Sequence, residues 1–311
     1  MKIISITNQK GGVGKTTTAI NLSACLAELG VRVLLIDLDP QANASSGLGV
    51  EVHDGMSIYT VLLGQDTLAS KIQATRLPNL SIITSEMALA GCEIEMAREG
   101  DHLGRLRGLL QPLKQSGEFD FVLIDTPPSL GILMTSALAA ADGLLIPIQC
   151  EYFGLEGLAK IVDVHQQIRD SGVSPHVTIE GILMTMYDQR TNLSKMVIAD
   201  VRRVFEDTVY QTVIPRSVRL GEAPSFGKPI IEYDAASTGA EAYRDLAREF
   251  LQRQGIAAAA PSKSGAAALE GGVEPPEEDD DGADSPAPEP ESPAPPQSPF
   301  TEPRPPGGFR I

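Results

Sequence analysis

The stretch TNQKGGVGKTTTA at residues 7–19 places three glycines between an apolar run and a helical sequence. The preceding run, Lys2–Thr7, carries three isoleucines and is typical of a short buried strand. The following stretch, Lys15–Leu29, has helical periodicity. A buried strand that turns directly into a helix through glycines predicts a sheet covered by helices. This junction therefore constrains the fold more than any other part of the sequence.

The first 255 residues repeat this alternation of apolar runs and helical stretches. The runs VLLI at 33–36 and FVLI at 121–124 are apolar at every position, which indicates strands buried on both faces, as in a parallel sheet. We therefore predict an α/β fold, a doubly wound and mostly parallel sheet flanked by helices. The predicted strands are Lys2–Thr7, Arg32–Asp37, Leu80–Thr84, Asp120–Asp125, Gly143–Ile148, Val177–Met184 and Val209–Ile214. The predicted helices are Lys15–Leu29, Asp101–Gln115, Leu130–Ala141, Leu155–Ser171, Asn192–Asp207 and Gly239–Gln254.

The glycine junction also has the composition of a phosphate-binding loop. Residues 14–16 (GKT) end the pattern G-x-x-x-x-G-K-[ST], although Gln9 occupies the position of its first glycine. Glycines allow backbone N–H groups to surround phosphate oxygens at the positive end of the following helix. In such a loop Lys15 contacts the β- and γ-phosphates and Thr16 binds Mg²⁺. The pattern does not require the second lysine, Lys10.

Two further predicted strands lead into carboxylates. Asp37 and Asp39 follow the run 33–36, and residues two apart in an extended chain point the same way, so both can face the phosphates. Asp125 ends the run 121–124, which is the Walker B arrangement that holds Mg²⁺ directly or through water. Ligands of parallel sheets bind at the carboxyl ends of the strands, so we expect these acids beside the loop.

A C-terminal segment carries half of the negative charge. From residue 256 onward, eleven acidic residues against three basic ones give a net charge of −8, out of −16 for the whole chain. The same segment holds 13 of the 23 prolines. Such a composition cannot bury enough apolar surface to fold. We interpret residues 1–255 as a folded domain and 256–311 as a disordered, Pro-rich acidic tail. The weakly acidic body does not exclude local contacts with nucleic acid.

The cysteines and the hydropathy pattern restrict the cellular setting. Cys25, Cys92 and Cys150 are odd in number and widely spaced, which argues against a disulfide framework or a cysteine-ligated metal. This pattern fits a reducing cytoplasm. No run of 18 apolar residues is present, so no membrane span is expected. The N-terminal residues begin a strand instead of a charged-then-apolar leader.

Five segments together resemble the ParA/Soj chromosome-partitioning ATPases, which belong to the deviant-Walker-A class of the MinD/ParA superfamily. They are KGGVGKTT (10–17), DLDPQ (37–41), DTPPSL (125–130), PIQCEYFGLEGL (147–158) and VIPRSVRLGEAPSFGKPI (213–230). The resemblance extends from Met1 to Gln254. It implies a P-loop NTPase fold, the cofactors ATP and Mg²⁺, and Mg-dependent hydrolysis of ATP to ADP and phosphate.

The resemblance also implies roles for individual residues. The catalytic residues are expected to be Lys10, Lys15 and Asp39, with Asp39 orienting the attacking water and Asp37 in support. Mg²⁺ contacts are expected at Thr16 and Asp125. The residues expected to bind ATP are Lys10, Gly11, Gly12, Val13, Gly14, Lys15, Thr16, Thr17, Pro215, Arg216 and Ser217, the last three beside the adenine and the dimer seam.

Lys10 is the family's signature lysine in this resemblance. It is expected to reach across a two-fold interface to the phosphates of a partner subunit, where a cation from each side offsets the repulsion between two nucleotides. Gly11 is expected at the same interface, where a side chain would obstruct the approach. The loop therefore predicts a homodimer in the ATP-bound state.

Non-specific binding of double-stranded DNA is implied at Arg190 and Arg219. The cations expected to extend this surface are Lys195, Arg202, Arg203 and Lys228. Three of them lie on one side of the predicted helix Asn192–Asp207, away from its apolar residues Val197, Val201, Val204 and Phe205. An ordinary solvated helix face has the same pattern. Phosphate contacts of this kind are sequence-independent and salt-sensitive.

The function implied is a cytoplasmic, nucleoid-associated switch. An ATP-bound sandwich dimer coats DNA until a ParB-like partner stimulates hydrolysis, and the cycle segregates chromosomes or plasmids. No arginine finger is evident in cis, so hydrolysis without the partner is expected to be slow. One alternative is a ParA-like ATPase that positions a protein complex on the nucleoid. Another is a MinD-like membrane ATPase, which needs a basic amphipathic C-terminal helix; here that region is rich in proline and acid, and no membrane contact is expected.

Overall fold

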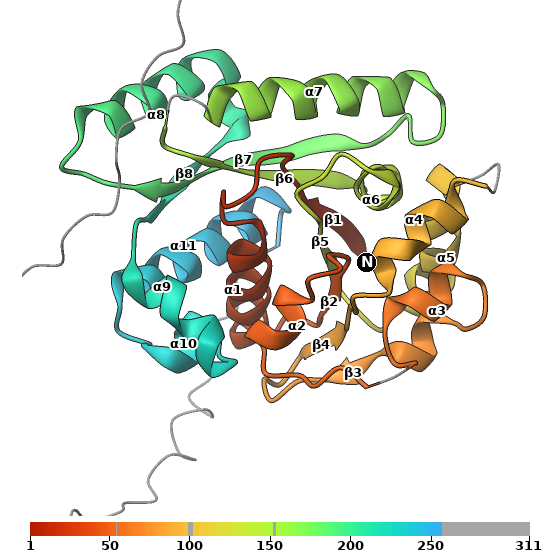
Figure 1. Cartoon of the computed structure of the whole chain (residues 1–311). Helices are drawn as coiled ribbons and strands as arrows, with labels where there is room; N and C mark the ends of the chain where they lie inside the picture. The colour runs from red at the N-terminus through yellow and green to blue at the C-terminus, as the bar shows by residue number, and fades with distance from the viewer. Residues whose placement is uncertain (54, 99–101, 152–153, 257–311) are drawn as a thin grey trace, which may run out of the picture. The chain divides into compact units, whose positions relative to one another are not determined.

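The computed structural model describes residues 1–53, 55–98, 102–151 and 154–256. These residues fold around one β-sheet. Within these residues the sheet has eight strands in the order β3-β4-β2-β5-β1-β6-β7-β8 (Figure 1). The pair β3–β4 is antiparallel and every other neighbouring pair is parallel. The strands are β1 (Lys2–Ile6), β2 (Val33–Asp37), β3 (Gln73–Ala74), β4 (Leu80–Ile83), β5 (Phe121–Asp125), β6 (Gly143–Gln149), β7 (Thr178–Tyr187) and β8 (Val209–Pro215).

The two faces of the sheet bury alternate side chains of the same strand. In β2, Leu34 and Ile36 belong to one core cluster, whereas Val33 and Leu35 belong to the other. Strand β5 divides in the same way, and all five of its residues are buried. This double burial is the physical reason for the uninterrupted apolar runs, because a strand with helices on both faces has no solvent side. The predicted α/β fold with a doubly wound, mostly parallel sheet is confirmed.

Helices cover both faces of the sheet (Figure 1). Apolar residues of α1 (Lys15–Glu28) and α11 (Thr238–Arg253) belong to the cluster on one face. On the other face, the core cluster includes residues of α5 (His102–Ser116), α6 (Ile132–Ala140), α7 (Gly154–Asp170) and α8 (Asn192–Phe205). The predicted strands and helices are therefore present, with ends that differ by at most three residues.

Short elements were not predicted. They are β3, α2 (Asn43–Gly47), α3 (Ile58–Leu62), α4 (Leu89–Met96), α9 (Val218–Glu222), α10 (Ile230–Tyr233) and the 3₁₀ turns η1 (Leu68–Lys71), η2 (Glu206–Thr208) and η3 (Ala223–Phe226). Most are too short to show a helical or strand period. Local caps define some of them instead: the Ser57 hydroxyl accepts the Tyr59 N–H at the start of α3, and Ser217 caps α9 in the same manner.

The prediction for α8 is partly wrong. Val204 is 66% exposed, whereas Val197 and Val201 are buried. Val204 lines an open hollow shared with α7, whereas the neighbouring Phe205 packs against the core cluster. Arg202 also turns inward, and its Nη2 donates to the carbonyl oxygen of Gln211 at 3.0 Å. The three cations predicted on one side of this helix therefore differ in exposure. Lys195 and Arg203 are exposed, whereas Arg202 is half-buried.

The predicted tail at 256–311 lies outside the described residues except for Ile256. Helix α11 ends at Arg253, close to the predicted end of the folded domain at 255. Among the residues that the structure describes, no helix is both long and apolar enough to cross a membrane.

Candidate functional site

The glycine loop has the backbone that a phosphate cradle needs. Gly12 and Gly14 adopt φ values of 74° and 88°, in the left-handed region that favours glycine. Gly14 is the N-cap of α1 and offers no side-chain cap, so the first N–H groups of this helix remain available to a ligand. Gly11 differs from these two glycines. A Cβ added to it would have only Pro128 within 4 Å, at an ordinary van der Waals distance of 3.8 Å. Among the residues that the structure describes, none therefore requires glycine at position 11 by close contact.

Side chains from the sheet hold the loop in place. The Thr185 hydroxyl of β7 donates to the carbonyl oxygen of Val13 at 2.9 Å. The Gln149 amide of β6 donates to the carbonyl oxygen of Gly12 at 2.9 Å. The Asn8 side chain accepts the backbone N–H of Lys10 at 2.9 Å. The loop is thus fixed by the carboxyl ends of strands that lie far from it in the sequence.

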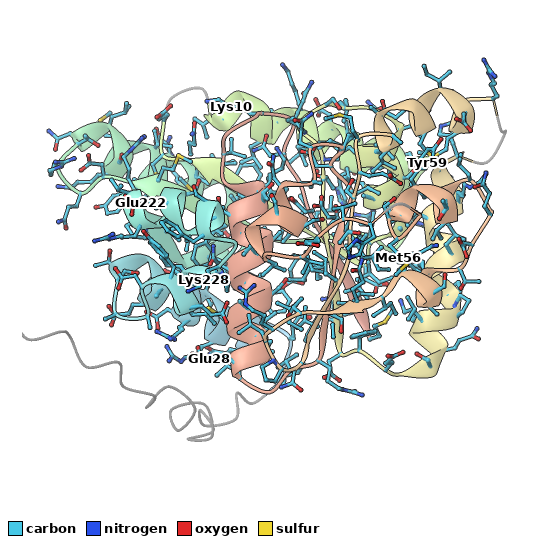
Figure 2. All side chains as sticks on the ribbon, turned by 60° about the horizontal axis from the view of Figure 1, so that its bottom comes forward. Lys10, Glu28, Met56, Tyr59, Glu222 and Lys228 are labelled. Carbon is cyan, nitrogen blue, oxygen red and sulfur yellow. The ribbon has the colours of Figure 1, made fainter. Side chains whose placement is uncertain are left out.

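Lys15 lies in a buried position, with 6% of its surface exposed. Its Nζ donates to the carbonyl oxygen of Lys10 at 3.1 Å. Burial lowers the pKa of Lys15, and the nearby carboxylates Asp125 and Asp39 oppose that shift. Figure 2 shows Lys10 at the loop end of α1 and Glu28 at the opposite end of the helix. The two lysines of the loop therefore differ, because Lys15 is enclosed and Lys10 is half-exposed.

Asp125 is the least satisfied polar residue of the site. It is fully buried, and neither carboxylate oxygen has a hydrogen-bond partner among the described residues. Burial raises the pKa of Asp125 well above its usual range, and the charge of Asp37 raises it further, whereas Thr16 and Lys15 oppose the rise. An orphaned buried carboxylate next to a threonine hydroxyl fits a divalent cation, since hard cations prefer oxygen ligands. Asp125 and Thr16 are thus suited to hold Mg²⁺.

Asp37 is the register neighbour of Asp125 at the ends of β2 and β5. Its carboxylate accepts the backbone N–H and the hydroxyl of Ser45, both at 2.8 Å, and the N–H of Asp39 at 3.2 Å. Burial, despite these bonds, raises the pKa of Asp37 to about 6. Because its oxygens are occupied by α2 and by its own loop, Asp37 acts as a support that fixes the segment carrying Asp39.

Asp39 retains free acceptor capacity. It is 7% exposed, and its Oδ1 accepts the N–H of Gln41 at 3.0 Å. Its charge acts on both Lys15 and Asp125, so the three lie close to one another at this edge of the sheet. A carboxylate here is positioned to orient a water molecule near the loop.

A hollow of about 190 Å³ opens beside the start of α1. It is lined by the predicted residues Gly14, Thr17, Pro215, Arg216 and Ser217, together with Thr185, Met186, Ile214, Leu220, Gly221 and Tyr243. The structure thus brings the predicted segment 215–217 to the loop, although the two are about two hundred residues apart in the sequence. A partly apolar hollow next to a phosphate cradle suits the base and sugar of a nucleotide.

The predicted DNA-contacting arginines lie on exposed surface and are paired with acids. Arg190 forms a bidentate contact with Asp188, at 2.9 and 2.7 Å, which lowers the pKa of Asp188 to about 2. Arg219 contacts Glu222 at 3.2 Å and Asp234 at 3.6 Å. Figure 2 labels Glu222, one of the two acids paired with Arg219.

The additional cations do not all join this surface. Lys195 and Lys228 are exposed, and Arg203 is exposed but paired with Asp200 at 2.9 Å. Arg216, predicted at the nucleotide, lines a second hollow together with Arg190. Arg202 is half-buried, and its Nη2 donates to the carbonyl oxygen of Gln211 at 3.0 Å.

Comparisons with known proteins agree with this geometry. A family model described as an AAA domain matches residues 1–179. The sporulation initiation inhibitor protein Soj of Bacillus subtilis is 51% identical over 249 residues, which cover 80% of this chain and 97% of Soj. The chain belongs to the ParA/Soj family. Within this family, the chromosome partitioning protein ParA of Caulobacter vibrioides is 46% identical over 255 residues, which cover 82% of this chain and 95% of that protein.

Solved structures resemble this ParA/Soj member as well. Cobyrinic acid a,c-diamide synthase of Mycobacterium smegmatis, solved with a bound ATP analog and magnesium, aligns with a TM-score of 0.70 and 33% sequence identity. The alignment covers 82% of this chain and 96% of that enzyme. The family resemblance read from the sequence motifs is thereby confirmed.

Several residues of the site were missed by sequence reasoning. Thr185, Gln149 and Tyr243 come from β7, β6 and α11 and reach the loop or the hollow through the fold alone. Gln149 lies inside one of the family-like segments, PIQCEYFGLEGL, which was the only available signal. Ser45 had no such signal, although it holds Asp37.

Proposed function

We propose that this ParA/Soj family member is an Mg-dependent ATPase whose ATP-bound form is a sandwich dimer that binds DNA without sequence preference. One observation carries the enzymatic part: the buried Lys15 and the partnerless carboxylate of Asp125 lie at the glycine loop. A buried lysine gains from the charge of a triphosphate, and a buried carboxylate without a hydrogen-bond partner among the described residues gains from Mg²⁺. The proposed ATPase domain spans residues 1–255.

We assign separate roles in this reaction to individual residues of the site. The backbone N–H groups of residues 11–17 bind the phosphates, and Lys15 contacts the β- and γ-phosphates. Thr16 and Asp125 hold Mg²⁺, which when bound neutralises charge on the phosphates. Asp39 accepts a hydrogen bond from the attacking water and orients it. The segment 215–217 encloses the base.

The dimer part rests on Lys10 and Gly11. The described part of the chain does not need glycine at position 11, since a Cβ there would make only an ordinary contact with Pro128. A second subunit approaching face to face explains the glycine, and it places Lys10 near the partner's phosphates. Lys10→Ala should bind ATP yet remain monomeric; a dimer of this variant in sedimentation velocity with an ATP analogue would contradict the cross-interface role.

The DNA part rests on Arg190 and Arg219. Each is exposed and ion-paired, and exposed pairs are worth little in water, so a phosphate can replace the acid at small cost. Binding of this kind places the protein on the nucleoid in the cytoplasm. Arg219→Glu should abolish binding to random duplex and leave ATP-dependent dimerisation intact.

One experiment tests the whole cycle. ATP hydrolysis is measured with Mg²⁺, random-sequence DNA and a candidate ParB-like partner, added singly and together. We expect slow basal turnover and stimulation only when DNA and partner are both present. Asp39→Ala should lower turnover by about 10²-fold or more and leave an ATP dimer on DNA. Stimulation by anionic lipid vesicles instead of DNA would favour a membrane-based ATPase.

A further inference from the structure

Gln149, the last residue of β6, makes three contacts with the phosphate loop and its surroundings. Its amide nitrogen donates to the carbonyl oxygen of Gly12 at 2.9 Å and lies 3.0 Å from the sulfur of Met186. Its amide oxygen accepts the Nζ of Lys10 at 3.2 Å. Gln149 is the one side chain among the described residues to which the Lys10 ammonium is bonded.

The backbone of Lys10 is fixed on both sides of this contact. Its N–H donates to Asn8, and its carbonyl oxygen accepts the ammonium of Lys15 at 3.1 Å. Asn8 is in turn anchored, because its amide nitrogen donates to the carbonyl oxygen of Pro147 in β6 at 2.8 Å. With the backbone held, the position of the Lys10 ammonium depends on its own four-carbon stem and on Gln149. The contact therefore decides whether the lysine lies against its own subunit or extends away from it.

The chemistry of this hydrogen bond allows Gln149 to bind and release Lys10 reversibly. An amide oxygen bound to an ammonium keeps the lysine charged and adds no opposing charge, so the bond is weaker than one to a carboxylate. The triphosphate of a second subunit offers the same lysine several anionic oxygens and is the stronger acceptor. Lys10 would leave Gln149 when such an acceptor arrives and would return when it departs.

We propose that Gln149 is a positioning residue that holds Lys10 against its own subunit until a second ATP-loaded subunit competes for it. This inference rests on the proposed role of Lys10 in the dimer. It makes the neutral amide at position 149 a determinant of the protein concentration at which dimers form. Gln149 does not contact the reacting atoms and acts through Lys10.

Two substitutions separate this role from the anchoring of Gly12. Q149M and Q149E both lose the amide nitrogen that donates to Gly12, so any loosening of the loop is common to both. They differ in their interaction with the Lys10 ammonium, because Q149M has no acceptor for it and Q149E replaces the amide acceptor with a carboxylate, which forms an ion pair. Dimerisation is measured by sedimentation velocity with saturating non-hydrolysable ATP analogue and Mg²⁺.

We expect Q149M to dimerise at roughly 25-fold lower protein concentration than the wild type, because each dimer no longer breaks two hydrogen bonds to Lys10, one per subunit and each worth roughly fivefold. We expect Q149E to need roughly 25-fold higher concentration, because its bond to Lys10 is about twice as strong in each of the two subunits. Q149A provides a second variant without the hold and should follow Q149M. The proposal would be overturned if Q149M and Q149A dimerised more weakly than the wild type, or if Q149M and Q149E dimerised equally well.

A control in the Lys10→Ala background removes the direct effect of charge at position 149. Binding of a fluorescent ATP analogue to K10A, K10A/Q149M and K10A/Q149E measures how each side chain affects the nucleotide within one subunit. The fold-difference in dimerisation between Q149M and Q149E must exceed the fold-difference in nucleotide binding between K10A/Q149M and K10A/Q149E. Dimerisation of K10A as tight as that of the wild type would instead contradict the proposed function, which keeps the two failures distinguishable.

Discussion

Asp125 lies in an environment that is unfavourable for a carboxylate in the absence of a ligand. A buried carboxylate without hydrogen bonds destabilises the fold, and one unsatisfied buried group costs about 1–3 kcal/mol, more when it is charged. We therefore expect Asp125→Asn to raise the free energy of unfolding of the nucleotide-free protein by about 1–3 kcal/mol at pH 7. The same variant should lose Mg-dependent ATP hydrolysis. Urea denaturation and a hydrolysis assay measure the two effects, and a destabilised D125N would contradict this account.

The pH dependence of this effect has a definite sign. Burial raises the pKa of Asp37 to about 6 and that of Asp125 well above its usual range, while unfolded aspartates titrate near ~3.9. Below about pH 4 both states hold their protons and the full stability is present. As pH rises, the unfolded chain releases protons that the folded protein retains, so stability is lost through the folded pKa values.

D125N isolates this trend from the other carboxylates. Its stability should match the wild type near pH 4 and exceed it increasingly toward pH 7, by up to about 1.4 kcal/mol per pH unit. Equilibrium unfolding in urea without nucleotide, at several pH values, measures the difference. A difference that is constant with pH would mean that Asp125 is ionised at every pH in the folded protein.

Residues were predictable where a local pattern defines them. The loop at 10–17, Asp39 and Asp125 follow from spacing at strand ends, and the structure places them together. Thr185 and Tyr243 were not predictable, because they meet the loop from β7 and α11 and a single hydroxyl on a strand carries no pattern. Arg202 was assigned by helical spacing alone, which does not report that β8 offers its side chain a carbonyl oxygen.

Among the elements, β7 shows how a distant strand supports the loop. The Thr185 hydroxyl lies 2.9 Å from the carbonyl oxygen of Val13 and 3.0 Å from that of Ile148, so one buried side chain joins the loop to β6 and β7. Thr185→Val keeps the shape and removes the bond. We expect a loss of about 1 kcal/mol in unfolding free energy and several-fold weaker ATP binding. Thr185→Ser is the matched control and should retain both; equal ATP affinity of T185V and wild type would remove β7 from the support of the loop.

Long elements were predicted better than short ones for a physical reason. A strand buried on both faces, such as β2, and an amphipathic helix, such as α11, repeat their pattern over enough residues to be recognised. The antiparallel β3 and the five-residue α2 depend on neighbours brought by the fold, as when Ser45 of α2 binds Asp37. The segment that fixes Asp39 was therefore missed, although Asp39 itself was predicted.

At the scale of the whole molecule, charge is divided unevenly along the chain. Residues 256–311 carry a net −8, and the relatives that match 249 and 255 residues cover 80% and 82% of the chain. A chain ending at Ile256 should therefore keep its ATPase activity and its ATP-dependent dimerisation. Its affinity for random duplex should rise, because each subunit no longer brings negative charge toward the phosphates, and the gain should shrink as salt increases.

Binding of full-length and shortened protein to the same duplex between about 50 and 200 mM salt measures this effect. If the acidic segment acts only by long-range repulsion, the two chains should converge at high salt. A variant with the five acids at 277–281 replaced by Gln and Asn should then have an affinity between those of the two chains, because it removes five of the eleven acidic residues of the segment. A gain that persists at high salt would mean that the segment occupies the DNA surface directly. Weaker DNA binding by the shortened chain would show instead that residues beyond 256 contribute contacts of their own.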